Sequence, residues 1–241
     1  MTQTSLFLLL LLLYFPCCNS LDTITPNQPL KDGDVLVSQG RGTFALGFFS
    51  PTNSKSRYVG IWFNNISQQT VVWVANRDNP LNTTSGLLSV NNHGNLVLQP
   101  FLNPVWSSNI SVSPISINTS ASAKIFDTGN LVLTSGTSSN NNSHTILWQS
   151  FDYPVNAYLP YMKSGFDRKT GFNRFLSSWK SLNDPGTGNA TYMMDRTGFL
   201  PQLFLYINNA TLIAGRGMDG CKTKRGIGDE SWLHLQLLLH R

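Results

Sequence analysis

Charged side chains are scarce in this chain. Asp, Glu, Lys and Arg make up 12% of its 241 residues, about half of the roughly 25% usual in soluble domains. Asn, Ser and Thr fill the polar positions instead, a composition typical of β-rich extracellular proteins. The net charge of +5 is spread thinly, and the sequence has no basic stripe of the kind that binds nucleic acid. The composition therefore argues against a nucleic-acid partner.

Lysine and arginine are absent from the first twenty residues, yet this stretch has the other features of a secretory signal. An apolar run from Leu6 to Phe15 is followed by the small and polar residues CCNS. The run is too short to cross a bilayer, which takes about 20 apolar residues. We predict a signal peptide over residues 1–20 with cleavage near Ser20. A buried core helix is the alternative interpretation.

Cysteine is nearly absent as well. Of three cysteines, Cys17 and Cys18 lie in the predicted signal, so that only Cys221 remains. A mature chain with one cysteine forms no internal disulfide, and it needs a substantial hydrophobic core to fold. The single Cys221 also indicates that any pairing partner lies outside this chain.

Acceptor sites for N-linked glycans, by contrast, are frequent. The pattern Asn-x-Ser/Thr marks such a site on the surface of a secreted protein. It occurs at Asn65, Asn82, Asn109, Asn118, Asn141, Asn189 and Asn209. We predict a glycosylated surface and an extracellular location.

Sustained helical periodicity is lacking between the signal and residue 150, while residues 232–239 could form a short amphipathic helix or be disordered. Before residue 150, short alternating apolar runs are separated by Gly, Asn, Pro and Ser, a pattern typical of strands and turns. The pattern predicts strands over residues 43–49, 57–63, 70–76, 87–92, 95–99, 123–127, 130–134 and 145–150. The expected fold class is all-β.

The pentapeptide GNLVL occurs twice, at residues 94–98 and 129–133. The first copy leads to Trp106 and the second to Trp148, while an earlier Gly-started hairpin leads to Trp73. Repeated units that cannot bury their apolar faces alone have to pack on one another. We predict three sheets around one axis, with these three tryptophans in a shared core. The flanking strands favour core positions for Trp62 and Trp179 too, over sugar-stacking ones.

Several segments closely resemble a known family. The stretches DVLVSQGRGTFALGFFSP, VVWVANRDNPL, LWQSFDYP and SSWKSLNDPGTGNATYMMD are similar, in the same order, to the extracellular region of plant S-domain (G-type lectin) receptor-like serine/threonine kinases and S-locus glycoproteins. The resemblance implies a bulb-type lectin domain at residues 21–149, a β-prism of three four-stranded sheets with pseudo-threefold symmetry. It also implies a second, partial lectin-like β unit at residues 150–215.

The mannose motif of bulb-type lectins, Q-x-D-x-N-x-V-x-Y, is kept only in part. The resemblance places its five positions in the first copy at Asn91, His93, Asn95, Val97 and Gln99, and in the second copy at Phe126, Thr128, Asn130, Val132 and Thr134. Only the Asn and the Val of the motif match in each copy. Neither His93 nor Thr128 can replace the motif's Asp, whose carboxylate accepts charge-assisted hydrogen bonds from sugar hydroxyls.

These departures predict degenerate sugar sites. The matching Asn and Val residues would then serve turn geometry and core packing. An altered polar groove formed by Asn91, Asn95 and Gln99 is the alternative.

A catalytic constellation is not recognisable in the sequence. There is no G-x-S-x-G elbow, no Cys/His cluster with metal-ligand spacing and no kinase glycine loop. Asp127 and Asp152 are interpreted as turn residues rather than as a glycosidase pair, and Arg77 with Asp78 as a surface turn. We therefore expect no enzyme activity, cofactor or metal in this chain.

The last segment, residues 216–241, matches nothing in the family, and we expect it to be a truncated, mis-spliced or wrongly predicted end without a membrane span. The sequence as a whole predicts a secreted recognition module for an extracellular protein, peptide or glycan, with dimerisation alongside related receptors as one mode. In some relatives such recognition is of self pollen. Two alternatives stay open, a piece of a membrane receptor serine/threonine kinase and, less favoured, a secreted mannose-binding lectin. A secreted hydrolase ranks last.

Overall fold

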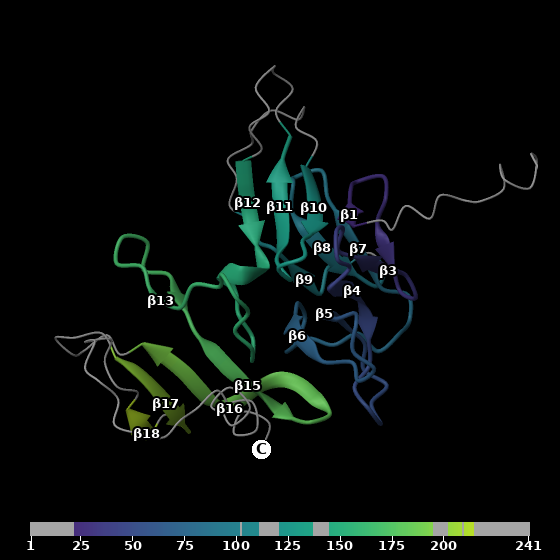
Figure 1. The fold of residues 1–241 in the computed structure, drawn as a ribbon. Coiled ribbons are helices and arrows are strands. Elements are labelled where there is room, and N and C mark those ends of the chain that lie inside the picture. Colours follow the sequence, from purple (N-terminus) through teal and green to yellow (C-terminus); the bar gives the residue numbers. More distant parts are fainter. Residues whose placement is uncertain are drawn as a thin grey trace, which may run out of the picture.

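The described part of the protein consists almost entirely of β-strands. The computed structural model describes residues 22–101, 103–110, 121–136, 145–194, 202–208 and 210–214. Apart from one short 3-10 helix, η1 (Ser150–Asp152), the elements of these residues are strands. Figure 1 shows an upper group formed by β1 to β12 and a lower group formed by β15 to β18. The all-β class predicted from the sequence is confirmed.

Three antiparallel four-stranded sheets make up the upper group. One has the order β3 (Val35–Val37), β4 (Phe44–Phe49), β5 (Tyr58–Phe63) and β6 (Val71–Val74). The second has the order β2 (Leu30–Lys31), β7 (Leu87–Val90), β8 (Leu96–Gln99) and β9 (Trp106–Ser107). The third has the order β1 (Thr23–Ile24), β10 (Ala121–Ile125), β11 (Leu131–Ser135) and β12 (Thr145–Gln149). The three sheets share one strand order, which confirms the predicted prism with pseudo-threefold symmetry.

The N-terminal segment closes this prism. The strands β1, β2 and β3 follow one another along the chain, but each pairs with a different sheet, through β10, β7 and β4 respectively. All eight strands predicted before residue 150 are present within a few residues of the expected bounds. The strands β1, β2 and β3 were not predicted, because two or three residues are too few to show alternation.

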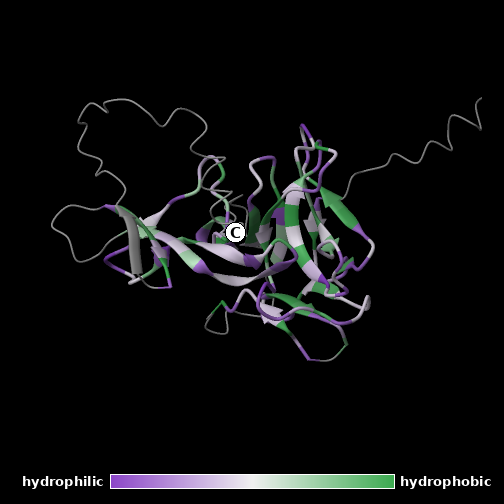
Figure 2. Cartoon of the chain, turned by 90° about the horizontal axis from the view of Figure 1, so that it is seen from below, coloured by the Kyte–Doolittle hydropathy of each residue, from purple (hydrophilic) through white to green (hydrophobic). Residues whose placement is uncertain are grey.

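The two GNLVL copies adopt the same structure in two different sheets. Gly94 and Gly129 have positive φ angles of 75° and 83° in the turns before β8 and β11, a conformation that glycine adopts without strain. The leucines on either side of each valine are completely buried: Leu96, Leu98, Leu131 and Leu133. Each copy thus specifies a hairpin turn and two side chains of the prism core, where hydrophobic residues are concentrated (Figure 2).

Three tryptophans meet where the fourth strands of the sheets converge. The ring centroids of Trp73, Trp106 and Trp148 lie 5.8 to 6.0 Å apart in each pair, and each pair is edge-to-face. Such pairs add about 0.5–1.5 kcal/mol beyond the burial of their area. The predicted shared tryptophan core is confirmed. Trp179 is buried as well, whereas Trp62 is only partly buried and lies outside this cluster.

A fourth four-stranded sheet follows the prism. It has the order β15 (Leu176–Ser181), β16 (Asp184–Met194), β17 (Leu203–Ile207) and β18 (Ala210–Ala214), and a small ribbon of β13 (Gly165–Phe166) and β14 (Asn173–Arg174) precedes it. This sheet confirms the predicted second β unit. Trp179 of β15 packs into the core cluster of the prism, so the two units share apolar contacts.

Replacing Trp148 by Ala tests the tryptophan cluster. The ring of Trp148 is 6% exposed and contacts both other rings, so we expect its loss to lower the free energy of unfolding by about 3–5 kcal/mol. Urea unfolding followed by far-UV circular dichroism measures this change. Trp62→Ala is the control, and we expect a smaller loss because Trp62 is partly exposed. Equal losses in the two variants would contradict a central role for the cluster.

Candidate functional site

The predicted sugar residues of the first repeat lie on the β7–β8 hairpin. The side-chain Oδ1 of Asn91 accepts hydrogen bonds from the backbone N–H groups of His93 and Asn95, both at 2.9 Å. The Oδ1 of Asn95 accepts from Ser108 Oγ at 3.0 Å and from the backbone N–H of Ile110 at 2.7 Å. Both amide oxygens are therefore engaged within the protein.

The remaining two positions of this repeat, Val97 and Gln99, differ in exposure. Val97 is buried and Gln99 is partly exposed, while the His93 side chain is exposed. The structure brings these residues onto one hairpin, where Asn91 Oδ1 bonds the backbone of its own turn and Asn95 Oδ1 bonds Ser108 and Ile110, which follow β9.

The second repeat uses its Asn in the same way. Asn130 Oδ1 accepts from Ser150 Oγ and from the backbone N–H of Phe151, both at 3.2 Å, and its Nδ2 donates to Gln149 Oε1 at 2.9 Å. Val132 is buried. Asn95 and Asn130 thus each fasten the start of a third strand to the turn that follows a tryptophan strand.

Those turns surround a cleft at the tryptophan end of the prism. Each repeat contributes its tryptophan and the residues after it, and the second unit closes the far side. The cleft has a volume of about 470 Å³, within the range of roughly 300–1,000 Å³ typical of ligand pockets. We call it the axial cleft. It is lined by Trp73–Ala75, Arg77, Asp78, Trp106–Asn109, Trp148, Asp152–Val155, Phe172, Asn173, Phe175, Ser177 and Thr187.

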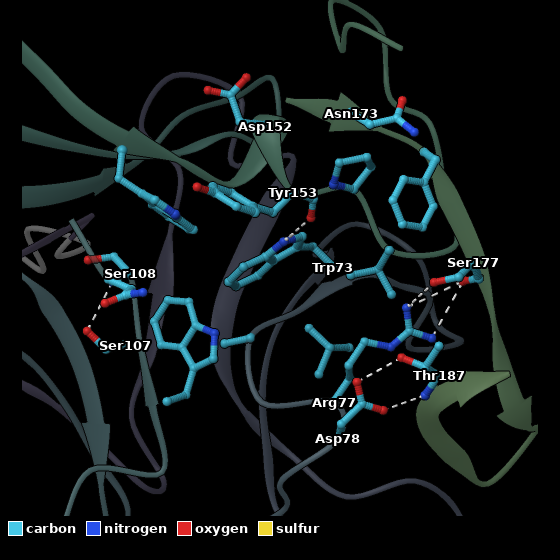
Figure 3. A pocket seen from close by; sticks show the side chains of 18 of the residues that line it. Trp73, Arg77, Asp78, Ser107, Ser108, Asp152, Tyr153, Asn173, Ser177 and Thr187 are labelled. Atoms are coloured by element: carbon cyan, nitrogen blue, oxygen red, sulfur yellow. Dashed lines mark hydrogen bonds between the residues drawn. The ribbon is translucent and has the colours of Figure 1, made fainter. Parts of the chain in front are cut away.

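Aromatic rings form much of the axial cleft (Figure 3). The ring of Tyr153 stacks on Trp148 with a centroid distance of 5.7 Å and an interplanar angle of 16°, and its carbonyl oxygen accepts a hydrogen bond from Trp73 Nε1 at 2.9 Å. Phe172 meets Tyr153 edge-on at 5.4 Å. Tyr153 is nevertheless 47% exposed. The cleft thus presents an aromatic surface to solvent.

Polar groups stand beside these rings. Asp152 accepts hydrogen bonds from Arg174 Nε at 2.7 Å and from Gln149 Nε2 at 3.0 Å. Asn173 Oδ1 is buried and has no hydrogen-bond partner within the described residues. A cleft of aromatic faces with a few fixed polar groups is the usual form of a small-molecule or sugar site.

Arg77 corrects the sequence interpretation. It is not part of a free surface turn, because its guanidinium reaches across to the second unit (Figure 3). It donates to Ser177 Oγ at 2.9 Å, to Ser178 O at 2.6 Å and to Pro185 O at 2.8 Å. Burial lowers its pKa to about 10, against the opposing effect of Asp78 and Asp184. At neutral pH it remains a cation held by carbonyl groups.

Asp78 completes this contact from the same turn. Its carboxylate accepts hydrogen bonds from the backbone N–H of Thr187 at 2.6 Å and from Thr187 Oγ1 at 2.7 Å. The turn after the first tryptophan therefore fastens the β15–β16 hairpin to the prism. Sequence reasoning missed this role, although a charged pair after a strand-ending tryptophan is a signal that could have prompted it.

Asp127 lies in a turn, as predicted, and it links two sheets. Its carboxylate accepts hydrogen bonds from Ser38 Oγ and from the backbone N–H groups of Arg41 at 2.6 Å and Thr43 at 3.3 Å. These hydrogen bonds, that from Ser38 first, lower the pKa of Asp127. Asp152 is engaged elsewhere, with Arg174. Both carboxylates thus have structural partners of their own.

Four of the seven predicted glycan acceptors lie within the described residues. The side chains of Asn65, Asn82, Asn109 and Asn189 are exposed. Asn118, Asn141 and Asn209 lie outside the described residues, as do the predicted signal and the tail with Cys221. Of the exposed four, only Asn109 lines the axial cleft.

Comparisons with known proteins agree with this structure. A family model described as D-mannose binding lectin matches residues 70–180. The G-type lectin S-receptor-like serine/threonine-protein kinase RKS1 of Arabidopsis thaliana is 46% identical over 203 residues, which are 83% of this chain and 23% of that protein. The S-locus-specific glycoprotein S6 of Brassica oleracea is 42% identical over 209 residues, which are 85% of this chain and 46% of that protein.

A solved structure of a monomeric monocot mannose-binding lectin from Gastrodia elata is also similar to this chain. It is 18% identical, with a TM-score of 0.38, and the match covers 54% of this chain and 96% of that one. The chain spans about a quarter of the length of its kinase relatives. Within the described residues, none of the elements is a helix with the length and apolar character to cross a bilayer. The family resemblance predicted from the sequence is confirmed.

Replacing Arg77 by Ala tests the contact between the units. Several carbonyl oxygens of β15 and β16 would lose their donor, and each unsatisfied buried acceptor costs about 1–3 kcal/mol. We expect faster limited proteolysis between the prism and β15, with the prism fragment surviving. Arg168→Ala, at an exposed arginine, is the matched control and should cleave like the parent. Identical proteolysis of both variants would show that Arg77 does not hold the units together.

The lowered pKa of Asp127 predicts that the stability of the protein depends on pH. Because its folded pKa is lowered, its contribution is complete above the usual carboxyl pKa of about 4 and is lost as the pH falls through the lowered value. We expect Asp127→Asn to reduce the urea midpoint at neutral pH and to flatten its decline below about pH 4. Asp167→Asn is the comparison, since the pKa of Asp167 is lowered too, but chiefly by hydrogen bonds within its own turn rather than between sheets. A parallel decline in Asp127→Asn and the parent would contradict the assignment.

Proposed function

Because this chain shares its lectin region with the G-type lectin S-receptor-like kinases and S-locus glycoproteins, we propose that it is an extracellular recognition module without catalytic activity. Its ligand would be a protein, a peptide or a glycan, and related receptors are candidate partners for dimerisation. The observation that supports this proposal best is the axial cleft, in which aromatic rings and polar groups converge between two β units. Clefts between domains are common sites of ligand binding.

The mannose sites are degenerate in this proposal. The support is that Asn95 and Asn130, which match the motif, hold backbone and side-chain groups of their own sheets. Their Oδ1 atoms each already accept two hydrogen bonds, and the motif's Asp is replaced by His93 or Thr128. A polar site without its matched partners loses most of its selectivity.

We propose the following domain boundaries for this recognition module. A signal at residues 1–20 would direct secretion, residues 21–149 would form the lectin prism and residues 150–215 the second lectin-like unit. The tail over 216–241 would be unrelated to the family. The kinase relatives support a second candidate, in which this sequence is the sensing part of a longer receptor serine/threonine kinase. A full-length transcript read across the codons for Asp219 to Lys222 distinguishes a short secreted glycoprotein from that receptor.

Mannose affinity chromatography tests the sugar prediction. We expect the secreted chain to pass through mannose resin without retention, because His93 and Thr128 supply no carboxylate. A bulb-type lectin with an intact motif is the positive control. Retention that free mannose elutes would contradict degenerate sites and would favour the secreted mannose-binding lectin. To exclude that the chain's own glycans occupy the sites and mask retention, the enzymatically deglycosylated protein is run in parallel.

A further inference from the structure

Among the predicted glycan acceptors that the structure describes, Asn109 alone lies in the wall of the axial cleft. It begins the sequon Asn109-Ile110-Ser111 and its side chain is exposed. We propose that the N-linked glycan of Asn109 occupies the axial cleft and packs its first sugar rings against the aromatic surface there. The cleft would then hold a ligand that the protein itself carries, and the external ligand of the proposed function, on which this inference rests, would meet a cleft filled by the glycan rather than an empty one.

The attachment point is held firmly in place. Asn109 has a φ angle of 48°, in the left-handed region that Asn tolerates better than most residues. Its backbone N–H donates to Ser107 Oγ at 3.1 Å, and the next N–H, that of Ile110, donates to Asn95 Oδ1 at 2.7 Å. Because hydrogen bonds fix the backbone on both sides of the acceptor, the first sugar leaves the protein from a defined position at the cleft.

The chemistry of the cleft suits an N-acetylglucosamine ring, the sugar that is linked to Asn. One face of a pyranose ring carries C–H groups and packs well on aromatic rings, and Tyr153 and Phe175 are 47% and 39% exposed in the cleft. The volume of about 470 Å³ admits a ligand of this size.

The covalent attachment of the glycan also explains how weak contacts between its sugars and the cleft suffice to keep it there. A tethered ligand has an effective concentration on the order of millimolar, so sugar stacking that is too weak to capture a free glycan can still fill the cleft. The glycan would leave the prism at Asn109 and touch the second unit at Tyr153 and Phe175. It would therefore stabilise the same contact between the units that Arg77 and Asp78 make.

The test measures how well the glycan is protected in the native protein. The full chain is secreted from cells that leave high-mannose glycans, and endoglycosidase H cuts within the first two sugars. Mass spectrometry of glycopeptides then gives occupancy and the cutting rate at each site. We expect the glycan on Asn109 to be cut about tenfold more slowly than that on Asn65, equivalent to about 1.4 kcal/mol of protection. Asn65 is an exposed acceptor outside the cleft.

Two sets of variants identify the cause of protection. Tyr153→Ala should raise the cutting rate at Asn109 to that at Asn65 without changing the rate at Asn65. Asn109→Gln and Ser111→Ala both remove the glycan, and each should lower Tm by about 2–4 °C, whereas Asn65→Gln should not. If Tyr153→Ala fails to fold, Phe175→Ala serves the same purpose at an exposed ring.

Three results would overturn the proposal. These are an unoccupied Asn109, equal cutting rates at Asn109 and Asn65 in the parent protein, and protection that survives the loss of both Tyr153 and Phe175. Binding of free N-acetylglucosamine oligosaccharides to a chain without a glycan at Asn109, combined with equal cutting rates, would assign the cleft to an external sugar instead. None of these results depends on mannose retention, so this inference and the proposed function can fail separately.

Discussion

The contact among Trp73, Trp106 and Trp148 is the constraint on which the rest of the structure depends. Each sheet supplies one ring from its fourth strand, and the rings meet edge-to-face within 6.0 Å. Three sheets can satisfy this contact together only if they share an axis and a common register. The turns that leave the tryptophan strands are then gathered at one end of the prism, and this gathering creates the axial cleft.

The second unit is positioned by the same end of the prism. Trp179 enters the prism core, and Arg77 and Asp78 hold the β15–β16 hairpin through its backbone. Contacts to backbone groups depend on the path of the hairpin more than on its side chains. Close packing of that path explains why Gly188 is required, since a Cβ there would lie 2.3 Å from the carbonyl oxygen of Trp179. The cleft is therefore bounded by two units whose relative position is set by polar and apolar contacts together.

The sequence was sufficient to predict the fold but not the set of residues that form the axial cleft, and the reason is physical. The alternating apolar runs and the repeated GNLVL indicate local hairpins. Three tryptophans at equivalent positions indicate that these hairpins pack together. The cleft arises from residues that are up to about a hundred positions apart, such as Arg77 and Ser177, and no local pattern records that they meet. From the sequence alone, Arg77 was therefore interpreted as a residue of a surface turn. The family resemblance assigns residue numbers to the motif positions, but only the structure shows what Asn95 and Asn130 bond to.

The partial survival of the mannose motif follows from these bonds. The motif's Asn has a role in each sheet that does not depend on sugar, because Asn95 ties β8 to the turn at Ser108 and Ile110, and Asn130 ties β11 to the turn at Ser150. Removing either amide would leave buried N–H groups without acceptors and would loosen a wall of the axial cleft. The Asp and Tyr positions of the motif have no such structural role. In the first repeat His93 and Gln99 occupy them without strain on the hairpin. The same asparagines therefore shape a cleft at the end of the prism whether or not the motif around them binds sugar.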